Sequence, residues 1–119
     1  MEIQALCVYC GSAGKVRESH LEAARNLGNL AAQAGVAIVY GGGRVGMMGA
    51  VAAGAMEALE AGNRDTAEYH VVDSMHARKQ LMAERSDAFC ALPGGFGTLD
   101  ETFEIITWRQ LKLHDKPVI

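Results

Sequence analysis

Three glycine-rich turns constrain this sequence more than any other feature, because each one joins a short apolar segment to a segment with helical character. The turns cover residues 10–14, 41–49 and 93–98. The segments before them are mainly apolar without alternation, which is typical of strands buried on both faces, and they cover residues 3–9, 36–40 and 87–92. Strands that alternate with helices form parallel sheets. We therefore predict an α/β fold with helices on both faces of a parallel sheet.

Four helices fit between and after these strands. Ser19 is a candidate cap for a first helix that Gly35 ends, and further helices are predicted over about 47–61, 73–85 and 98–113, the last opened by Thr98. Residues 116–119 have the character of a new strand, whereas residues 62–69 offer no strand where the alternation requires one. The 119 residues correspond to a single domain, residues 1–119. The two irregularities lead us to expect a missing segment at 63/64 and a missing C-terminal part.

The composition of the chain argues against some classes of binding partner and indicates the cellular compartment. The formal net charge of −3 disfavours a nucleic-acid binder with a basic patch. No uncharged apolar run approaches the ~18–20 residues of a membrane span, and the first residues have no basic signal-peptide region. Three cysteines are few and odd in number, which fits reduced thiols in a cytoplasmic protein. Cys7 and Cys10 form a C-x-x-C pair, but no second ligand pair accompanies it, so we expect core cysteines rather than a redox or zinc site.

The three turns are expected to share one rim of the sheet. Turns that follow parallel strands lie at the carboxyl ends, where open α/β proteins bind ligands. Glycine permits close approach of the backbone, and the start of the next helix offers free N–H groups and a positive dipole end to an anion. A nucleotide or phosphate site is therefore predicted. The alternative is that the glycines serve only tight turns between strand and helix.

The second turn also fits the dinucleotide fingerprint G-x-G-x-x-G at residues 41–46. The acidic residue that should end the next strand is missing, because Glu60 falls at the end of the same helix. No lysine-plus-hydroxyl pair follows the glycines, which excludes a Walker A loop. A dinucleotide enzyme is therefore a disfavoured alternative.

The third turn carries the most specific pattern, Pro-Gly-Gly-Phe-Gly-Thr-Leu-Asp-Glu at residues 93–101. Backbone amides from Gly95 to Thr98, with the Thr98 hydroxyl, are predicted to cradle a phosphate. Glu101 lies one helical turn later on the same face, and since like charges repel, we expect its carboxylate beside a sugar rather than beside the phosphate. Thr98 and Glu101 also fit a capping box, T-x-x-E, in which the role of Glu101 would be structural.

This stretch resembles the PGGxGTxxE motif of the LOG family, the cytokinin riboside 5′-monophosphate phosphoribohydrolases. Further segments resemble the family in order and context, at residues 10–12, 40–49 and 74–79, so that the resemblance covers nearly all of the chain. It implies a Rossmann-like dimer that hydrolyses the N-glycosidic bond of an N6-modified AMP to free base and ribose 5-phosphate. On this resemblance, we expect the family's strand and loop after the second glycine helix, and its last strands and helices, to be missing from this sequence.

The resemblance also implies the roles of individual residues. Glu101 and Arg78 would be catalytic: the carboxylate would stabilise an oxocarbenium-like state or orient water, and the guanidinium would pair with it or stabilise the departing purine. Phosphate binding is assigned to Gly94, Gly95, Gly97 and Thr98. Nucleotide binding is assigned to Ser12, Gly42, Gly43, Met75 and Lys79. A surface role for Arg78 and a core role for Met75 are the structural alternatives.

No cofactor is implied, and no cluster of His, Asp or Glu has metal-ligand spacing, so we expect a metal-free reaction. The expected partners are a nucleoside monophosphate and a second copy of the chain, since the small-residue helix at 47–61 and the helix that carries Trp108 have apolar faces that one copy leaves uncovered. Relatives were also labelled lysine decarboxylases, but Lys79 lies in a helix beside Arg78 rather than in an isolated Schiff-base position. A non-catalytic nucleotide or molybdenum-cofactor binding protein of the same superfamily is the remaining alternative.

Overall fold

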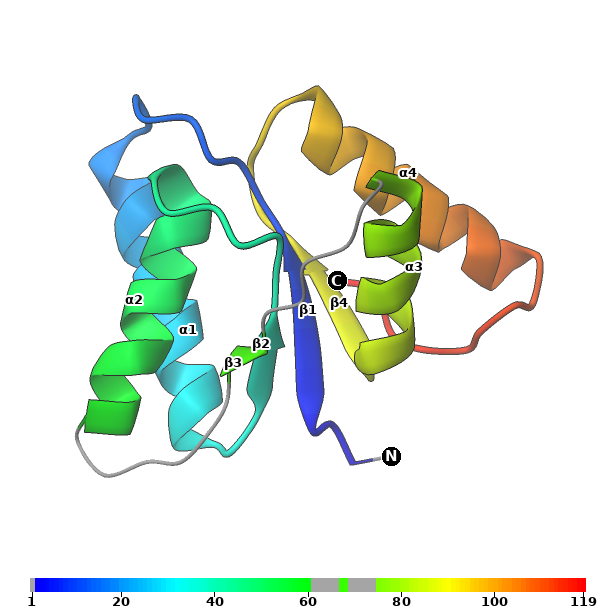
Figure 1. Ribbon diagram of the computed structural model, residues 1–119, viewed down its shortest axis with the longest axis horizontal. Helices are drawn as coiled ribbons and strands as arrows, with labels where there is room; N and C mark the ends of the chain where they lie inside the picture. The colour runs from blue at the N-terminus through cyan, green and yellow to red at the C-terminus, as the bar shows by residue number, and fades with distance from the viewer. Residues whose placement is uncertain (1, 61–66, 69–74) are drawn as a thin grey trace.

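Strands and helices alternate along the chain in the computed structural model, which describes residues 2–60, 67–68 and 75–119 (Figure 1). The strands are β1 (Ala5–Tyr9), β2 (Ala37–Val39), β3 (Ala67–Glu68) and β4 (Ala88–Ala91). The helices are α1 (Glu18–Gln33), α2 (Gly46–Glu60), α3 (Met75–Arg85) and α4 (Phe96–Gln110). The predicted α/β class and its alternation are confirmed.

The sheet is parallel and has the strand order β3-β2-β1-β4. Beyond β4, Phe89 bridges Val118, and the N–H of Ile119 donates to the carbonyl of Phe89 at 2.8 Å, which confirms the predicted strand start at residues 116–119. The prediction of no strand within residues 62–69 is wrong, because β3 pairs with β2. Pairing with an existing edge outweighs the weak strand propensity of Ala and Glu. The proposed junction at 63/64 lies outside the described residues.

Helices α1 and α2 cover one face of the sheet, and α3 and α4 cover the other (Figure 1). Side chains of β1 alternate between two cores, as the period of a strand requires. Leu6 and Val8 pack with residues of α1 and α2, whereas Cys7 and Tyr9 pack with Met82 of α3 and Ile105 of α4. This double burial is the physical reason why the strand segments are continuously apolar. The Rossmann-like arrangement is confirmed.

Glycines allow α1 and α2 to lie unusually close. A Cβ atom on Gly28 of α1 would lie 2.0 Å from the carbonyl oxygen of Val51, and one on Gly54 of α2 would lie 1.9 Å from that of Arg25. Any side chain at either position would push the two helices apart. Small residues of α2 therefore pack against α1 within the chain, so the small-residue character of this helix is no longer a reason for expecting a dimer.

The starts of two helices differ from the prediction. α1 begins at Glu18, and Arg17 precedes it without a side-chain cap hydrogen bond, so the predicted cap at Ser19 is wrong. α4 begins at Phe96 after an N-cap at Gly95, which makes Thr98 the third residue of the helix rather than its opening residue. A capping box requires its Thr at the N-cap, and the structural alternative for Glu101 is therefore excluded. Among the described helices, none is both long and apolar enough to cross a membrane.

Candidate functional site

The three glycine-rich turns meet at the carboxyl ends of the strands, as predicted (Figure 1). In the first turn, the N–H of Gly11 donates to the carbonyl of Pro93 in the third turn at 3.2 Å. The carbonyl of the same glycine accepts a hydrogen bond from the N–H of Met48, in the motif of the second turn, at 3.0 Å. Gly11 therefore joins all three turns through its backbone.

Close backbone contacts explain why glycine occurs at two further positions of this rim. Gly46 has a φ of 65°, a conformation that favours glycine, and a Cβ atom there would lie 2.4 Å from the carbonyl oxygen of Ala13. A Cβ atom on Gly94 would lie 2.1 Å from Oγ1 of Thr98 and 2.8 Å from the backbone nitrogen of Gly11. The turns thus pack backbone against backbone, and backbone atoms form much of the wall that they present to a ligand.

A cavity of about 540 Å³ opens at this rim between the first turn, the third turn, α3 and α4. Most of the predicted site residues line it, namely Ser12, Arg78, Gly94, Gly95, Gly97, Thr98 and Glu101. The sequence interpretation missed an apolar part of the wall that Val16 and Met48 provide. Their residue types carry no site signal, and their position beside the glycine turns was the one available indication.

The N-terminus of α4 lies at one end of the cavity, and this end is suited to an anion. The first i→i−4 hydrogen bond of this helix runs from the N–H of Leu99 to the carbonyl of Gly95 at 3.2 Å, so the N–H groups of residues 96–98 have no acceptor within the helix. Gly97 and Thr98 line the cavity, and Thr98 is buried. Unpaired N–H groups and the positive end of the helix dipole favour a phosphate at this place.

Glu101 lies one turn further along α4 and lines the same cavity. Burial raises the pKa of its carboxyl group, and the positive charge of Arg78 partly opposes this increase. The negative charge of Asp100 adds to the increase. A desolvated carboxylate beside a guanidinium is a suitable group to face developing positive charge on a sugar.

Arg78 reaches the cavity from α3. Its Nη1 donates to the carbonyl of Gly41, two residues after the end of β2, over 3.4 Å, which is a long hydrogen bond. Its Nε is buried and has no hydrogen-bond partner among the described residues. The sequence patterns did not predict Gly41 as a hydrogen-bond partner of Arg78. The predicted catalytic residues, Arg78 and Glu101, are therefore brought to one cavity from two helices.

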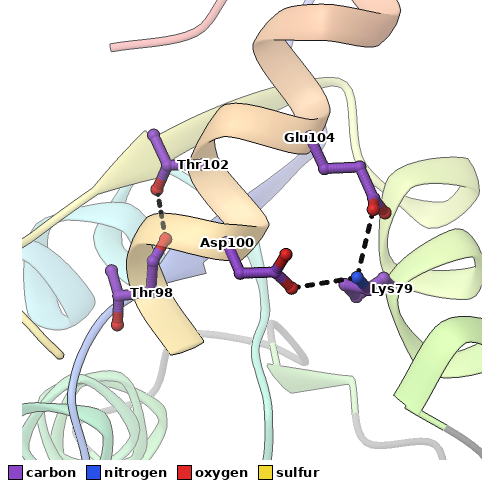
Figure 2. A network of polar contacts seen from close by, with 5 residues as sticks. All are labelled: Lys79, Thr98, Asp100, Thr102 and Glu104. Atoms are coloured by element: carbon purple, nitrogen blue, oxygen red, sulfur yellow. Dashed lines mark hydrogen bonds and ion pairs between the residues drawn. The ribbon is translucent and has the colours of Figure 1, made fainter. Parts of the chain in front are cut away.

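Lys79 follows Arg78 on α3, but its ammonium group points to α4 instead of lining the cavity (Figure 2). Nζ lies 3.0 Å from Oδ2 of Asp100 and 3.1 Å from Oε2 of Glu104. These hydrogen bonds raise the pKa of Lys79. Nucleotide binding by Lys79 stays a prediction, and the structure gives this side chain other partners.

The remaining predicted nucleotide-binding residues lie beside the cavity or outside the described part. Gly42 has a φ of 81°, and Gly43 donates its N–H to Sδ of Met48 at 2.9 Å. Neither glycine is among the residues that line the cavity. Met75 is the first residue of α3, and its side chain lies outside the described part of the structure.

Cys7 and Cys10 contribute to opposite cores of the sheet, as expected for core cysteines. Burial raises the pKa of both thiols to about 12, so both are protonated and unreactive near neutral pH. Within the described ranges, no three His, Cys, Asp or Glu side chains are grouped to hold a metal ion. The expectation of a metal-free reaction stays a prediction.

The fold and the rim together define a Rossmann-like α/β protein with a ligand cavity at the carboxyl ends of its strands. A model of the family described as "Possible lysine decarboxylase" matches residues 30–119. The chain belongs to this family, and the resemblance to its LOG members is confirmed.

Curated relatives include a cytokinin riboside 5′-monophosphate phosphoribohydrolase of Arabidopsis thaliana, which is 41% identical over 98% of this chain and 61% of its own length. The rice (Oryza sativa subsp. japonica) enzyme called LOG is 43% identical over 95% of this chain and 52% of its own length. The chain thus spans between half and two thirds of these relatives.

Solved structures with the same fold include the molybdenum cofactor carrier protein of Chlamydomonas reinhardtii, at 24% identity and a TM-score of 0.75. That match covers 98% of this chain and 75% of the carrier. The molybdenum cofactor binding protein of Rippkaea orientalis is 25% identical with a TM-score of 0.71, over 99% of this chain and 76% of that one. These similarities concern the fold.

Proposed function

We propose that this chain forms the catalytic core of a phosphoribohydrolase, which cleaves the N-glycosidic bond of AMP or an N6-modified AMP. The observation that carries the proposal is that Glu101 and Arg78 line the same cavity as the anion-binding start of α4. The relatives named as cytokinin riboside 5′-monophosphate phosphoribohydrolases support this substrate class and link the reaction to cytokinin activation.

The substrate's phosphate binds at the N–H groups of Gly97 and Thr98, which places the ribose one helical turn along α4. There the carboxylate of Glu101 stabilises positive charge at the anomeric carbon as the bond to the base breaks, and it orients the water that attacks this carbon. The hydroxyl of that water remains on the sugar, and its proton goes to the solvent or to the base. Arg78 stabilises the electron pair that leaves with the base.

A non-catalytic binding protein is the second candidate function. The fold shared with a molybdenum cofactor carrier protein and a molybdenum cofactor binding protein favours it, because one fold can serve binding as well as catalysis. The two candidate functions give Glu101 different roles, since a carrier has no need of a desolvated carboxylate beside its ligand. Turnover of a nucleoside monophosphate therefore separates them.

A lysine decarboxylase is disfavoured by the chemistry of Lys79. A Schiff-base lysine must be unprotonated to attack a carbonyl group, and a lowered pKa favours that state. Lys79 has two carboxylates as partners, and these hydrogen bonds raise its pKa. Its ammonium group is therefore protonated and committed to an ion-pair network.

We also propose that the protein is a homodimer in the cytoplasm. Four apolar residues form an exposed stripe on α4 at helical spacing, Phe96, Leu99, Phe103 and Ile106. Such a stripe is the kind of surface that a second copy covers. The free thiols of Cys7, Cys10 and Cys90 fit a reducing compartment.

The test is incubation of the protein with AMP and N6-isopentenyl-AMP, followed by chromatography for free base. Release of base together with ribose 5-phosphate supports hydrolysis. Tight binding of the nucleotide without release of base supports the carrier. A full-length protein that neither binds nor cleaves either compound contradicts both candidates.

A further inference from the structure

Lys79 joins α3 to α4 through two carboxylates one helical turn apart (Figure 2). Its side chain is 14% exposed, whereas those of Asp100 and Glu104 are 62% and 27% exposed. Two short contacts at the end of a side chain with little exposed surface hold this long side chain in one geometry. The arrangement therefore differs from an ordinary surface ion pair, in which both partners remain mobile.

The sequence positions of this network relate it to the cavity. Lys79 directly follows Arg78 on α3, and Asp100 directly precedes Glu101 on α4. Neighbours on a helix point about 100° apart, so one residue of each pair can face the opposite helix while the other faces the cavity. The contacts of Lys79 thus fix the relative position of the two backbone segments that carry the catalytic pair.

Among the described residues, Arg78 makes only weak hydrogen-bond contacts, so its position depends on this support. Its hydrogen bond to Gly41 is long, 3.4 Å, and its buried Nε has no hydrogen-bond partner among the described residues. A guanidinium held so loosely takes its position from the helix that carries it. Movement of α3 by about 1 Å is enough to cost on the order of 10²-fold in rate when it misplaces a catalytic group.

We propose that Lys79 is a positioning residue, which clamps α3 to α4 through Asp100 and Glu104 and so holds Arg78 and Glu101 against the same glycosidic bond. This inference rests on the proposed function. It replaces the interpretation of Lys79 as a nucleotide ligand, because Nζ is directed at two carboxylates and lies outside the cavity lining. It also assigns Asp100 and Glu104 a role that the motif alone does not suggest.

The two roles of Lys79 predict opposite effects when its acidic partners are removed. If Lys79 bound the nucleotide, Asp100→Asn with Glu104→Gln would release the ammonium group and tighten nucleotide binding. If Lys79 is a clamp, the same double variant and Lys79→Met both lower kcat, by about 10²-fold, while KM stays within about threefold of wild type. Lys79→Arg should recover most of kcat, because a guanidinium can also bridge carboxylates.

The experiment measures kcat, KM and the calorimetric Kd for AMP in wild type, Lys79→Met, Lys79→Arg and the double carboxylate variant. Arg25→Met is the matched control, since it breaks the exposed α1–α2 ion pair with Glu57 and should leave kcat unchanged. A raised KM in Lys79→Met with normal kcat, or normal kcat in the double variant, overturns the clamp.

Failure of the proposed function gives a different result. Wild-type protein that releases no base from any nucleoside monophosphate overturns the hydrolase, and with it the catalytic purpose of the clamp. The Kd series still decides the role of Lys79 in that case. Weaker AMP binding in Lys79→Met with tighter binding in the double variant identifies a ligand contact, whereas unchanged Kd in both excludes a ligand contact and leaves Lys79 as a structural bridge between α3 and α4.

Discussion

Thr98 and Glu101 lie one turn apart on the same face of α4, and both line the cavity at the carboxyl ends of the strands. The threonine is the third residue of the helix, where backbone N–H groups have no acceptor within the helix. The glutamate is desolvated, and its pKa is raised. One helix thus presents unpaired N–H groups and a carboxylate about 5 Å apart along its axis, the rise of one turn.

Glu101→Gln should abolish turnover and leave nucleotide binding nearly unchanged. The substitution keeps size and hydrogen bonding but removes the charge that stabilises the oxocarbenium-like state, and a loss of about 10²-fold or more in kcat is expected. Steady-state kinetics and calorimetry with AMP measure the two effects. Glu57→Gln, in the exposed pair on α2, is the matched control. Near-normal kcat in Glu101→Gln would remove this residue from the mechanism.

The same substitution should stabilise the fold at pH 7. Because burial raises the folded-state pKa of Glu101 above its unfolded value, the folded state holds the proton more tightly, and the free energy of unfolding falls as pH rises through this range. The ionised carboxylate is therefore a cost at pH 7 that Gln removes. We expect a higher Tm for Glu101→Gln at pH 7 and no difference well below pH 4. A lower Tm at pH 7 would indicate that the contact with Arg78 outweighs the burial.

Gly94→Ala should be poorly tolerated, in contrast to Gly97→Ala. A Cβ atom on Gly94 meets Oγ1 of Thr98 at 2.1 Å and the backbone of Gly11 at 2.8 Å, whereas nothing lies within 4 Å of a Cβ atom on Gly97. Overpacking of this kind costs about 1–3 kcal/mol of unfolding free energy. Chemical denaturation of the two variants checks the difference. Equal stability would mean that the first and third turns are not packed as closely as described.

A homodimer should form through the exposed stripe on α4. Phe96 is 91% exposed and Phe103 is 64% exposed, and both lie on one side of the helix with Leu99 and Ile106. Light scattering at micromolar concentration should give twice the monomer mass, and Phe103→Glu with Ile106→Glu should give the monomer. Leu30→Glu, an exposed apolar site on α1, is the control that should not change the mass. A monomeric wild-type protein would contradict this prediction.

Local patterns predicted which residues of the third turn lie at the cavity, because these residues are close in the sequence. Glycines 94, 95 and 97, Thr98 and Glu101 occupy one turn and one helix start, so their placement followed from the spacing alone. Arg78 needed the family resemblance, since a helix arginine has no local signal of its own.

The sequence patterns did not predict the features that depend on tertiary contacts. The partners of Lys79 lie 21 and 25 residues away, and the packing of α3 on α4 determines them. β3 has two residues of low strand propensity and exists through its pairing with β2. The hydrogen bond from Arg78 to the carbonyl of Gly41 also joins segments 37 residues apart.

If phosphate binding at the start of α4 drives cleavage at Glu101, turnover depends on the 5′-phosphate of the substrate. The measurement that checks this dependence is kcat/KM for one base presented as riboside, 5′-monophosphate and 5′-triphosphate. We expect the monophosphate to be the best substrate, because binding energy from the phosphate holds the glycosidic bond against Glu101, so that its loss lowers the rate as well as the affinity. The triphosphate should also be poorer, since none of the described residues that line the cavity is a lysine that could take further phosphates. Equal kcat/KM for riboside and monophosphate would show that phosphate binding does not drive cleavage.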